Sequence, residues 1–151
     1  MDIRLARSAD EGTTWQSVTV NDDATNADQF NPAMAVDSDG NLHISFYDTR
    51  LSSTFEAADV FLARSSDEGA SFSNQRVTTV SSNDSSTNPL RDPTANLGDR
   101  TAIAITSGGE VIAWTDTRLS SEDVFLSRVR VPFHPGPESP PRGSRGVVLP
   151  R

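Results

Sequence analysis

The chain contains no cysteine among its 151 residues, so disulfide bonds and thiolate chemistry are excluded. No apolar run approaches the roughly 20 residues that cross a bilayer. Met1 is followed by a charged, strand-like segment and not by the apolar stretch of a signal peptide. Helical periodicity longer than a turn or two is also missing. We therefore expect a soluble chain, without a signal peptide of its own, whose fold is all-β.

Basic residues are few, with 13 Lys and Arg against 21 Asp and Glu and a formal net charge of −8. Such a charge repels phosphate backbones, which argues against nucleic acid as the partner. The two histidines, His43 and His134, lack the spacing of a zinc site. The segment 37–41, Asp-Ser-Asp-Gly-Asn, has its glycine misplaced for an EF-hand loop, so we interpret it as a hairpin turn. We expect no metal and no cofactor.

What the chain does have is a repeated segment. Residues 59–72 read Asp-Val-Phe-Leu-Ala-Arg-Ser-Ser-Asp-Glu-Gly-Ala-Ser-Phe, and residues 2–15 read Asp-Ile-Arg-Leu-Ala-Arg-Ser-Ala-Asp-Glu-Gly-Thr-Thr-Trp. The first half returns at 123–128, and Asp-Thr-Arg-Leu-Ser-Ser occurs at both 48–53 and 116–121. A segment that recurs in this way indicates a repeat architecture.

Alternating and apolar runs separated by turn residues predict short antiparallel strands. The expected strands are 2–8, 16–20, 32–36, 41–48, 59–64, 75–80, 102–105, 111–116 and 123–129. Residues 32–80 make four successive strands, and the polar segment 81–98 is expected to be a surface loop. Strands 102–105 and 111–114 are apolar on both sides, which predicts sheets covered on both faces, as in a β-propeller.

The repeated segment ends in a turn whose residues suit a local hydrogen-bonded structure. An aspartate oxygen accepts turn N–H groups, glycine adopts a positive φ, and hydroxyl side chains satisfy neighbouring groups. We also expect the closing Trp15 to point into the core. The structural residues of the two turns are Ser8, Asp10, Gly12, Trp15, Ser65, Asp67, Gly69 and Phe72.

Residues 8–15 and 65–72 fit the pattern Ser-x-Asp-x-Gly-x-Ser/Thr-aromatic. In this the chain resembles the Asp-box, or bacterial neuraminidase repeat, of the sialidase superfamily. The resemblance implies a turn between the third and fourth strands of a propeller blade. Members of that family include sialidases, other glycosidases and non-catalytic binding proteins. The resemblance also permits a secreted protein.

On this interpretation residues 1–131 form a partial β-propeller, with two strands of one blade, four of a second and three of a third. Residues 132–151 form a tail rich in Pro, Gly and Arg that we expect to be disordered. A closed propeller needs roughly four to eight blades, so the chain is too short to close alone. We expect either a fragment of a longer protein or a homo-oligomer.

Strand parity places the two Asp-box turns at one rim and the repeated Asp-Thr-Arg segments at the opposite rim, where sialidase-like proteins bind ligands. The candidate ligand-binding residues at that rim are Asp48, Arg50, Arg100, Asp116 and Arg118. Their guanidinium groups could pair with the carboxylate of a carbohydrate ligand. Alternatively, each Asp–Arg pair ties down its own loop, and repetition favours this alternative because a repeat-encoded residue serves the repeat.

Sialidases also need an Arg-Ile-Pro segment, a tyrosine nucleophile with a glutamate partner, and an acid/base aspartate. Here Phe30-Asn31-Pro32 stands where Arg-Ile-Pro would fall, and Tyr47 alternates with Phe46 in a strand as a packing residue does. No catalytic residue is assigned, and we predict a glycan-binding or structural role. The alternatives are an exo-sialidase-like glycoside hydrolase, active only in a closed or assembled propeller, and a protein-interaction scaffold.

Overall fold

The computed structural model describes residues 1–54, 57–82, 97, 101–119 and 122–130. These residues form nine strands and no helix, so none of them could cross a membrane as a helix. The tail 132–151, Arg100 and most of the polar segment 81–98 lie outside them. The strands are β1 (Arg4–Arg7), β2 (Gln16–Thr19), β3 (Gln29–Val36), β4 (Leu42–Asp48), β5 (Asp59–Ser65), β6 (Ser73–Arg76), β7 (Ala102–Thr106), β8 (Gly109–Asp116) and β9 (Asp123–Val129).

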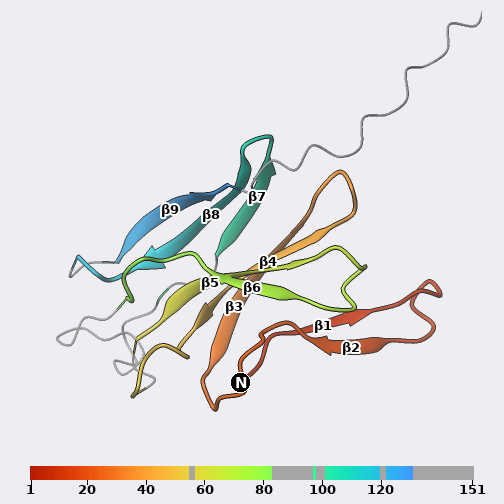
Figure 1. Ribbon diagram of the computed structural model, residues 1–151, viewed down its shortest axis with the longest axis horizontal. Helices are drawn as coiled ribbons and strands as arrows, with labels where there is room; N and C mark the ends of the chain where they lie inside the picture. The colour runs from red at the N-terminus through yellow and green to blue at the C-terminus, as the bar shows by residue number, and fades with distance from the viewer. Residues whose placement is uncertain (55–56, 83–96, 98–100, 120–121, 131–151) are drawn as a thin grey trace, which may run out of the picture.

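The strands form three antiparallel sheets, β1–β2, β3–β4–β5–β6 and β7–β8–β9, in which each strand pairs with the next one along the chain. Figure 1 shows the β3–β6 sheet lying between the other two. The predicted all-β class is confirmed, as is the grouping of strands into sets of two, four and three.

Two strand boundaries differ from the prediction. β3 begins at Gln29 and not at Pro32, because a register shift between Phe30 and Ala33 lets the strand continue past the proline. β6 begins at Ser73, directly after the turn, and ends at Arg76, so the predicted strand 75–80 is wrong over most of its length. Because β6 begins directly after the turn, the geometry of the turn also determines how β6 pairs with β5.

The β3–β6 sheet carries a hydrophobic core on each face. Toward β7–β9, Tyr47 and Leu62 pack with Ile112 and Trp114. On the other face Ile44, Phe46, Phe61 and Ala63 pack with Ile3 and Val20 of the β1–β2 region. Both faces of β4 and β5 are therefore buried, as expected for a sheet within a stack.

The same expectation is wrong for β7, which is half-buried on one face and exposed on the other, and for β8, which is buried on one face and half-buried on the other. We define the outer face of the β7–β9 sheet by Ala104, Val111, Ala113, Val124, Leu126 and Arg128. No other strand of the described residues packs on this face. The sequence correctly predicted that these strands are apolar. The sheet that was expected to cover their outer face is not among the described residues.

The internal repeat allows this outer face to be compared with a buried one. β5 and β9 occupy the same position in their sheets and carry Asp-Val-Phe-Leu at their starts. Val60 and Leu62 of β5 are 1% and 0% exposed, whereas the corresponding Val124 and Leu126 of β9 are 79% and 67% exposed. The outer face thus presents to solvent the side chains that the preceding sheet buries.

Candidate functional site

The first repeated turn, residues 8–15, closes on itself through side-chain hydrogen bonds. Asp10 Oδ1 accepts the backbone N–H of Thr14 at 2.8 Å, and the Thr14 hydroxyl donates to Asp10 Oδ2 at 2.6 Å. Ser8 Oγ accepts the N–H of Gly12 at 2.7 Å. Glu11 and Gly12 both have positive φ, at 56° and 87°, and glycine adopts the larger of these values without the strain that a side chain would bring.

The second turn, residues 65–72, repeats these contacts. Asp67 accepts the N–H of Ser71 at 3.0 Å and its hydroxyl hydrogen at 2.6 Å, while Gly69 donates its N–H to Ser65 Oγ at 2.9 Å. The hydrogen bonds from Ser71 hold the pKa of the Asp67 carboxyl well below its usual range. Both turns therefore have the local structure that the sequence predicts.

The aromatic residues that close the two turns differ in burial. Phe72 is half-buried and packs against the core between the β1–β2 and β3–β6 sheets. Trp15 is 64% exposed, and its indole N–H donates to the carbonyl oxygen of Gly12 at 3.0 Å. The prediction that Trp15 enters the core is wrong, because it stacks on its own turn and no described sheet covers it.

At the opposite rim, Asp48 and Arg50 form a closed pair. Asp48 accepts the N–H of Arg50 at 2.7 Å and its guanidinium Nε–H at 2.8 Å, and Arg50 also pairs with Asp22 and Asp23. Its guanidinium lies over the ring of Phe61, 4.4 Å from the ring centre. Burial lowers the pKa of Arg50, but the acidic neighbours outweigh burial and raise it above its ordinary value.

Asp116 and Arg118 repeat that arrangement in the β7–β9 sheet. Asp116 accepts the N–H of Arg118 at 2.9 Å and pairs with its guanidinium, which lies 4.8 Å from the ring centre of Phe125. Asp116 also accepts the indole N–H of Trp114 at 2.9 Å. Burial opposes ionisation of Asp116, but these donors lower the pKa of its carboxyl.

The structure thus brings each of the four described candidate residues, Asp48, Arg50, Asp116 and Arg118, to its own sequence neighbour. Within the described part of the chain, no contact joins the Asp48–Arg50 pair to the Asp116–Arg118 pair. Arg100 lies outside the described residues. Arg50 and Arg118 each pair with a carboxylate and stack on a phenylalanine ring of their own sheet. This arrangement agrees with the alternative in which each Asp–Arg pair holds its own loop in place.

Tyr47 is a packing residue, as its place in the strand predicts. It is 1% exposed, stacks on Phe30 at a centroid distance of 5.2 Å, and donates its hydroxyl hydrogen to the carbonyl oxygen of Thr115 at 2.7 Å. Burial raises the pKa of this phenol far above its ordinary value. A buried, hydrogen-bonded and strongly protonated phenol is poorly suited to act as a nucleophile.

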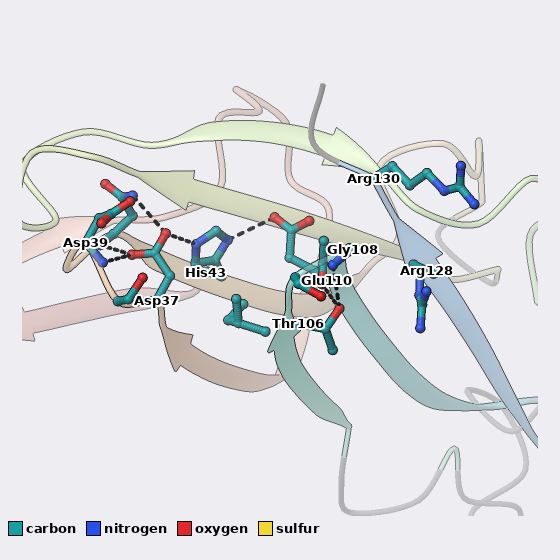
Figure 2. A pocket seen from close by; sticks show the side chains of 13 residues that line it. Asp37, Asp39, His43, Thr106, Gly108, Glu110, Arg128 and Arg130 are labelled. Atoms are coloured by element: carbon teal, nitrogen blue, oxygen red, sulfur yellow. Dashed lines mark hydrogen bonds and ion pairs between the residues drawn. The ribbon is translucent and has the colours of Figure 1, made fainter. Parts of the chain in front are cut away.

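Sequence reasoning missed a charged cluster that joins the β3–β6 sheet to the β7–β9 sheet. His43 of β4 contacts Glu110 Oε1 of β8 through Nδ1 at 2.9 Å and Asp37 Oδ2 through Nε2 at 3.2 Å (Figure 2). Arg64 of β5 donates its Nε–H to the same Glu110 oxygen. The second oxygen, Glu110 Oε2, is buried without a hydrogen-bond partner among the described residues.

The ionisation of this cluster follows from its hydrogen bonds. Burial raises the pKa of the Glu110 carboxyl, but the contacts with Arg64 and His43 outweigh burial, and the pKa falls below its ordinary value. The hydrogen bond from the Asn41 side chain, assisted by backbone donors and by His43, lowers the pKa of Asp37 to about 2. Both carboxylates are therefore ionised at neutral pH, on either side of His43.

A cleft of about 610 Å³ lies beside this cluster, between the β3–β4 turn and the β7–β8 turn. These turns follow the first strand of each sheet, and the turn of residues 65–72 follows the third strand of its sheet. Since alternate turns of an antiparallel sheet lie at the same end, the cleft lies at the rim of the repeated turns and not at the predicted ligand rim. The cleft is lined by Asp37, Ser38, Asp39, Asn41, His43, Ile105, Thr106, Ser107, Gly108, Gly109, Glu110, Arg128 and Arg130.

No family model, curated protein or solved structure matches this chain. Among the described residues, no group of three or more His, Asp and Glu side chains is placed to hold a metal ion. One sequence signal could have indicated the cluster: Glu110 stands where the repeat has Leu42 in the preceding sheet. A carboxylate at an apolar position of a repeat is a deviation that calls for a specific partner.

Proposed function

We propose that this chain is a non-catalytic segment of a sialidase-like, Asp-box β-propeller that works as a structural scaffold and assembles with further sheets. Two turns of the Ser-x-Asp-x-Gly pattern with matching hydrogen bonds support the resemblance. The order of strands in successive antiparallel sheets is also that of consecutive blades.

The observation that carries the assembly is the contrast between β5 and β9. Val60 and Leu62 are 1% and 0% exposed, whereas their counterparts Val124 and Leu126 in an otherwise regular strand are 79% and 67% exposed. Burying one such side chain is worth about 1.5–3 kcal/mol. An apolar sheet face of this kind marks an interaction surface.

The predicted ligand rim favours a structural role over hydrolysis. Arg50 and Arg118 already have carboxylate partners and stack on Phe61 and Phe125, so binding a sugar carboxylate would require breaking buried ion pairs. Tyr47 is buried and hydrogen-bonded to a backbone carbonyl. These contacts support a non-catalytic segment.

Light scattering on the purified chain over a wide concentration range tests the assembly. We expect a mass above that of one chain that falls on dilution. A strictly monomeric chain with a cooperative melt would overturn the proposal. Hydrolysis of a fluorogenic sialoside that is lost on Arg118→Ala would overturn its non-catalytic part.

A second candidate function is glycan binding, and the cleft is the observation that favours it. A volume of about 610 Å³ lined by carboxylate, hydroxyl and amide groups suits a polyhydroxylated ligand. Binding on a glycan array that is lost on Asp39→Ala but kept on Arg118→Ala would support this cleft as the ligand site. Loss on Arg118→Ala alone would place the ligand at the opposite rim.

A further inference from the structure

The cleft between the β3–β4 turn and the β7–β8 turn carries charged groups that have no partner. On the β3–β4 turn, the backbone N–H of Asp39 donates to Asp37 Oδ1 at 2.9 Å, whereas the Asp39 carboxylate pairs with no other described residue. At the end of β9, Arg128 and Arg130 line the cleft and pair with no carboxylate in the described part of the chain. All three residues are exposed. The cleft therefore holds one unpaired anion and two unpaired cations.

These opposite charges lie at opposite ends of the cleft. Figure 2 shows Asp39 at one end and Arg128 and Arg130 at the other. The guanidinium of Arg128 lies against the β7–β8 turn, because a Cβ added at Gly108 would come within 3.2 Å of Arg128 Nη1. No ion pair joins Asp39 to either arginine across this span, so both ends remain open to a ligand.

The other carboxylates that line the cleft are already engaged. Asp37 accepts the side-chain N–H of Asn41 at 2.8 Å and contacts His43. Glu110 is 1% exposed and contacts the same histidine at 2.9 Å. Asp39 is thus the carboxylate that a ligand reaches without breaking a contact between the two sheets.

Between the charged ends, the cleft offers small polar groups and no aromatic surface. Ser38, Ser107 and Gly108 line it and are exposed, and none of the described lining residues is aromatic. A neutral sugar ring therefore finds no ring to stack on, and recognition depends on the charged ends and on hydrogen bonds. A cleft of about 610 Å³ is roughly 8 Å across, which about two or three residues of an extended peptide span.

We propose that this cleft binds a zwitterionic ligand, with its ammonium group on Asp39 and its carboxylate on Arg128 and Arg130. A guanidinium donates two parallel N–H groups to a carboxylate, which suits arginine to that end. A short peptide with free termini has this chemistry, and so does a saccharide that carries an amino group and an acid group. The inference rests on the second candidate function, in which this cleft is a ligand site, and names the class of ligand.

An NMR titration of the full chain with triglycine, a peptide without side chains, tests the site. We expect the backbone amides of both turns, including those of Asp39 and Gly108, to shift as triglycine is added. The affinity should be weak and should fall as salt is added, because ion pairs at exposed residues are screened. Loss of one such pair should raise the Kd by about two- to fivefold.

Matched ligands and variants show which group lies at which end. N-acetyltriglycine lacks the ammonium group, and triglycine amide lacks the carboxylate. Asp39→Asn should weaken triglycine binding and should remove the effect of N-acetylation, because the two changes delete the same contact. Arg128→Gln combined with Arg130→Gln should remove the effect of amidation in the same way. Glu11→Gln, at an exposed turn residue outside the cleft, is the control and should bind triglycine like the wild type.

Two saccharides separate the sources of the ligand and the two proposals. Tighter binding of triglycine than of a disaccharide of glucosamine and glucuronic acid supports a peptide ligand, and the reverse order supports a zwitterionic saccharide. Binding of neutral maltotriose as tightly as either charged probe, without dependence on Asp39, overturns the zwitterion while glycan binding stands. Charged probes whose binding is unchanged in the Asp39 and arginine variants also overturn it. Absence of any shift with all probes overturns both the zwitterion and the cleft as a ligand site.

Discussion

Replacing Glu110 by glutamine tests the charged contact between the β3–β6 and β7–β9 sheets. The Glu110 side chain is 1% exposed and shares one oxygen between His43 and Arg64. Glutamine keeps the size of the side chain but removes the charge that both partners face. Breaking a buried ion pair by removing one partner costs about 3–5 kcal/mol. Because the amide oxygen can still accept one hydrogen bond, we expect a loss near the lower end, about 3 kcal/mol.

Urea unfolding followed by far-ultraviolet circular dichroism measures this loss directly. A double-mutant cycle with Arg64→Met should give a coupling of about 1–3 kcal/mol, since the two side chains share one contact. Glu11→Gln is the control, because Glu11 is an exposed turn residue, and should change stability by less than about 0.5 kcal/mol. A Glu110→Gln loss below about 1 kcal/mol without coupling to Arg64 would refute the view that this cluster joins the sheets.

Three further predictions concern the repeat. Gly69→Ala should lower the Tm more than Gly12→Ala does. Both glycines have positive φ, but only at Gly69 would a Cβ overlap side chains of β1 and β4. Equal losses of Tm would contradict this. Leu62→Ala should cost about 2–5 kcal/mol in urea unfolding, against less than about 0.5 kcal/mol for the exposed Val36→Ala. Hydrogen bonds from Thr14 lower the pKa of Asp10 to about 2, so the ionised carboxylate stabilises the folded state above pH 4 and this stabilisation is lost as the pH falls toward 2. The Tm of Asp10→Asn should therefore fall less steeply than the Tm of the wild type over that range.

The repeated turns could be predicted because their chemistry is local. Asp10 and Asp67 bind groups only four residues away in the chain, so the spacing of residue types already contains the geometry. The strands were predictable for the same reason, since each pairs with its neighbour across a short connection. Polar turns between apolar runs were sufficient to place them.

Burial and the charged cluster could not be predicted in this way. Trp15 and Phe72 close turns of the same pattern, but a side chain is buried only where another element covers it. Glu110 finds its partners in strands that lie far away in the sequence, on a different sheet. Sequence periodicity assigns a residue to a face and says nothing about which charge that face will meet.

The pairing of every described strand with its chain neighbour has a consequence for how the protein folds. Sequence-local hairpins close quickly, whereas the contact of His43 with Glu110 spans 67 residues and forms only after two sheets exist. We therefore expect the docking of the sheets to be the slow step of folding. In hydrogen exchange, amides of β4 and β5, which are covered on both faces, should be the last to open, and those of the β1–β2 ribbon among the first.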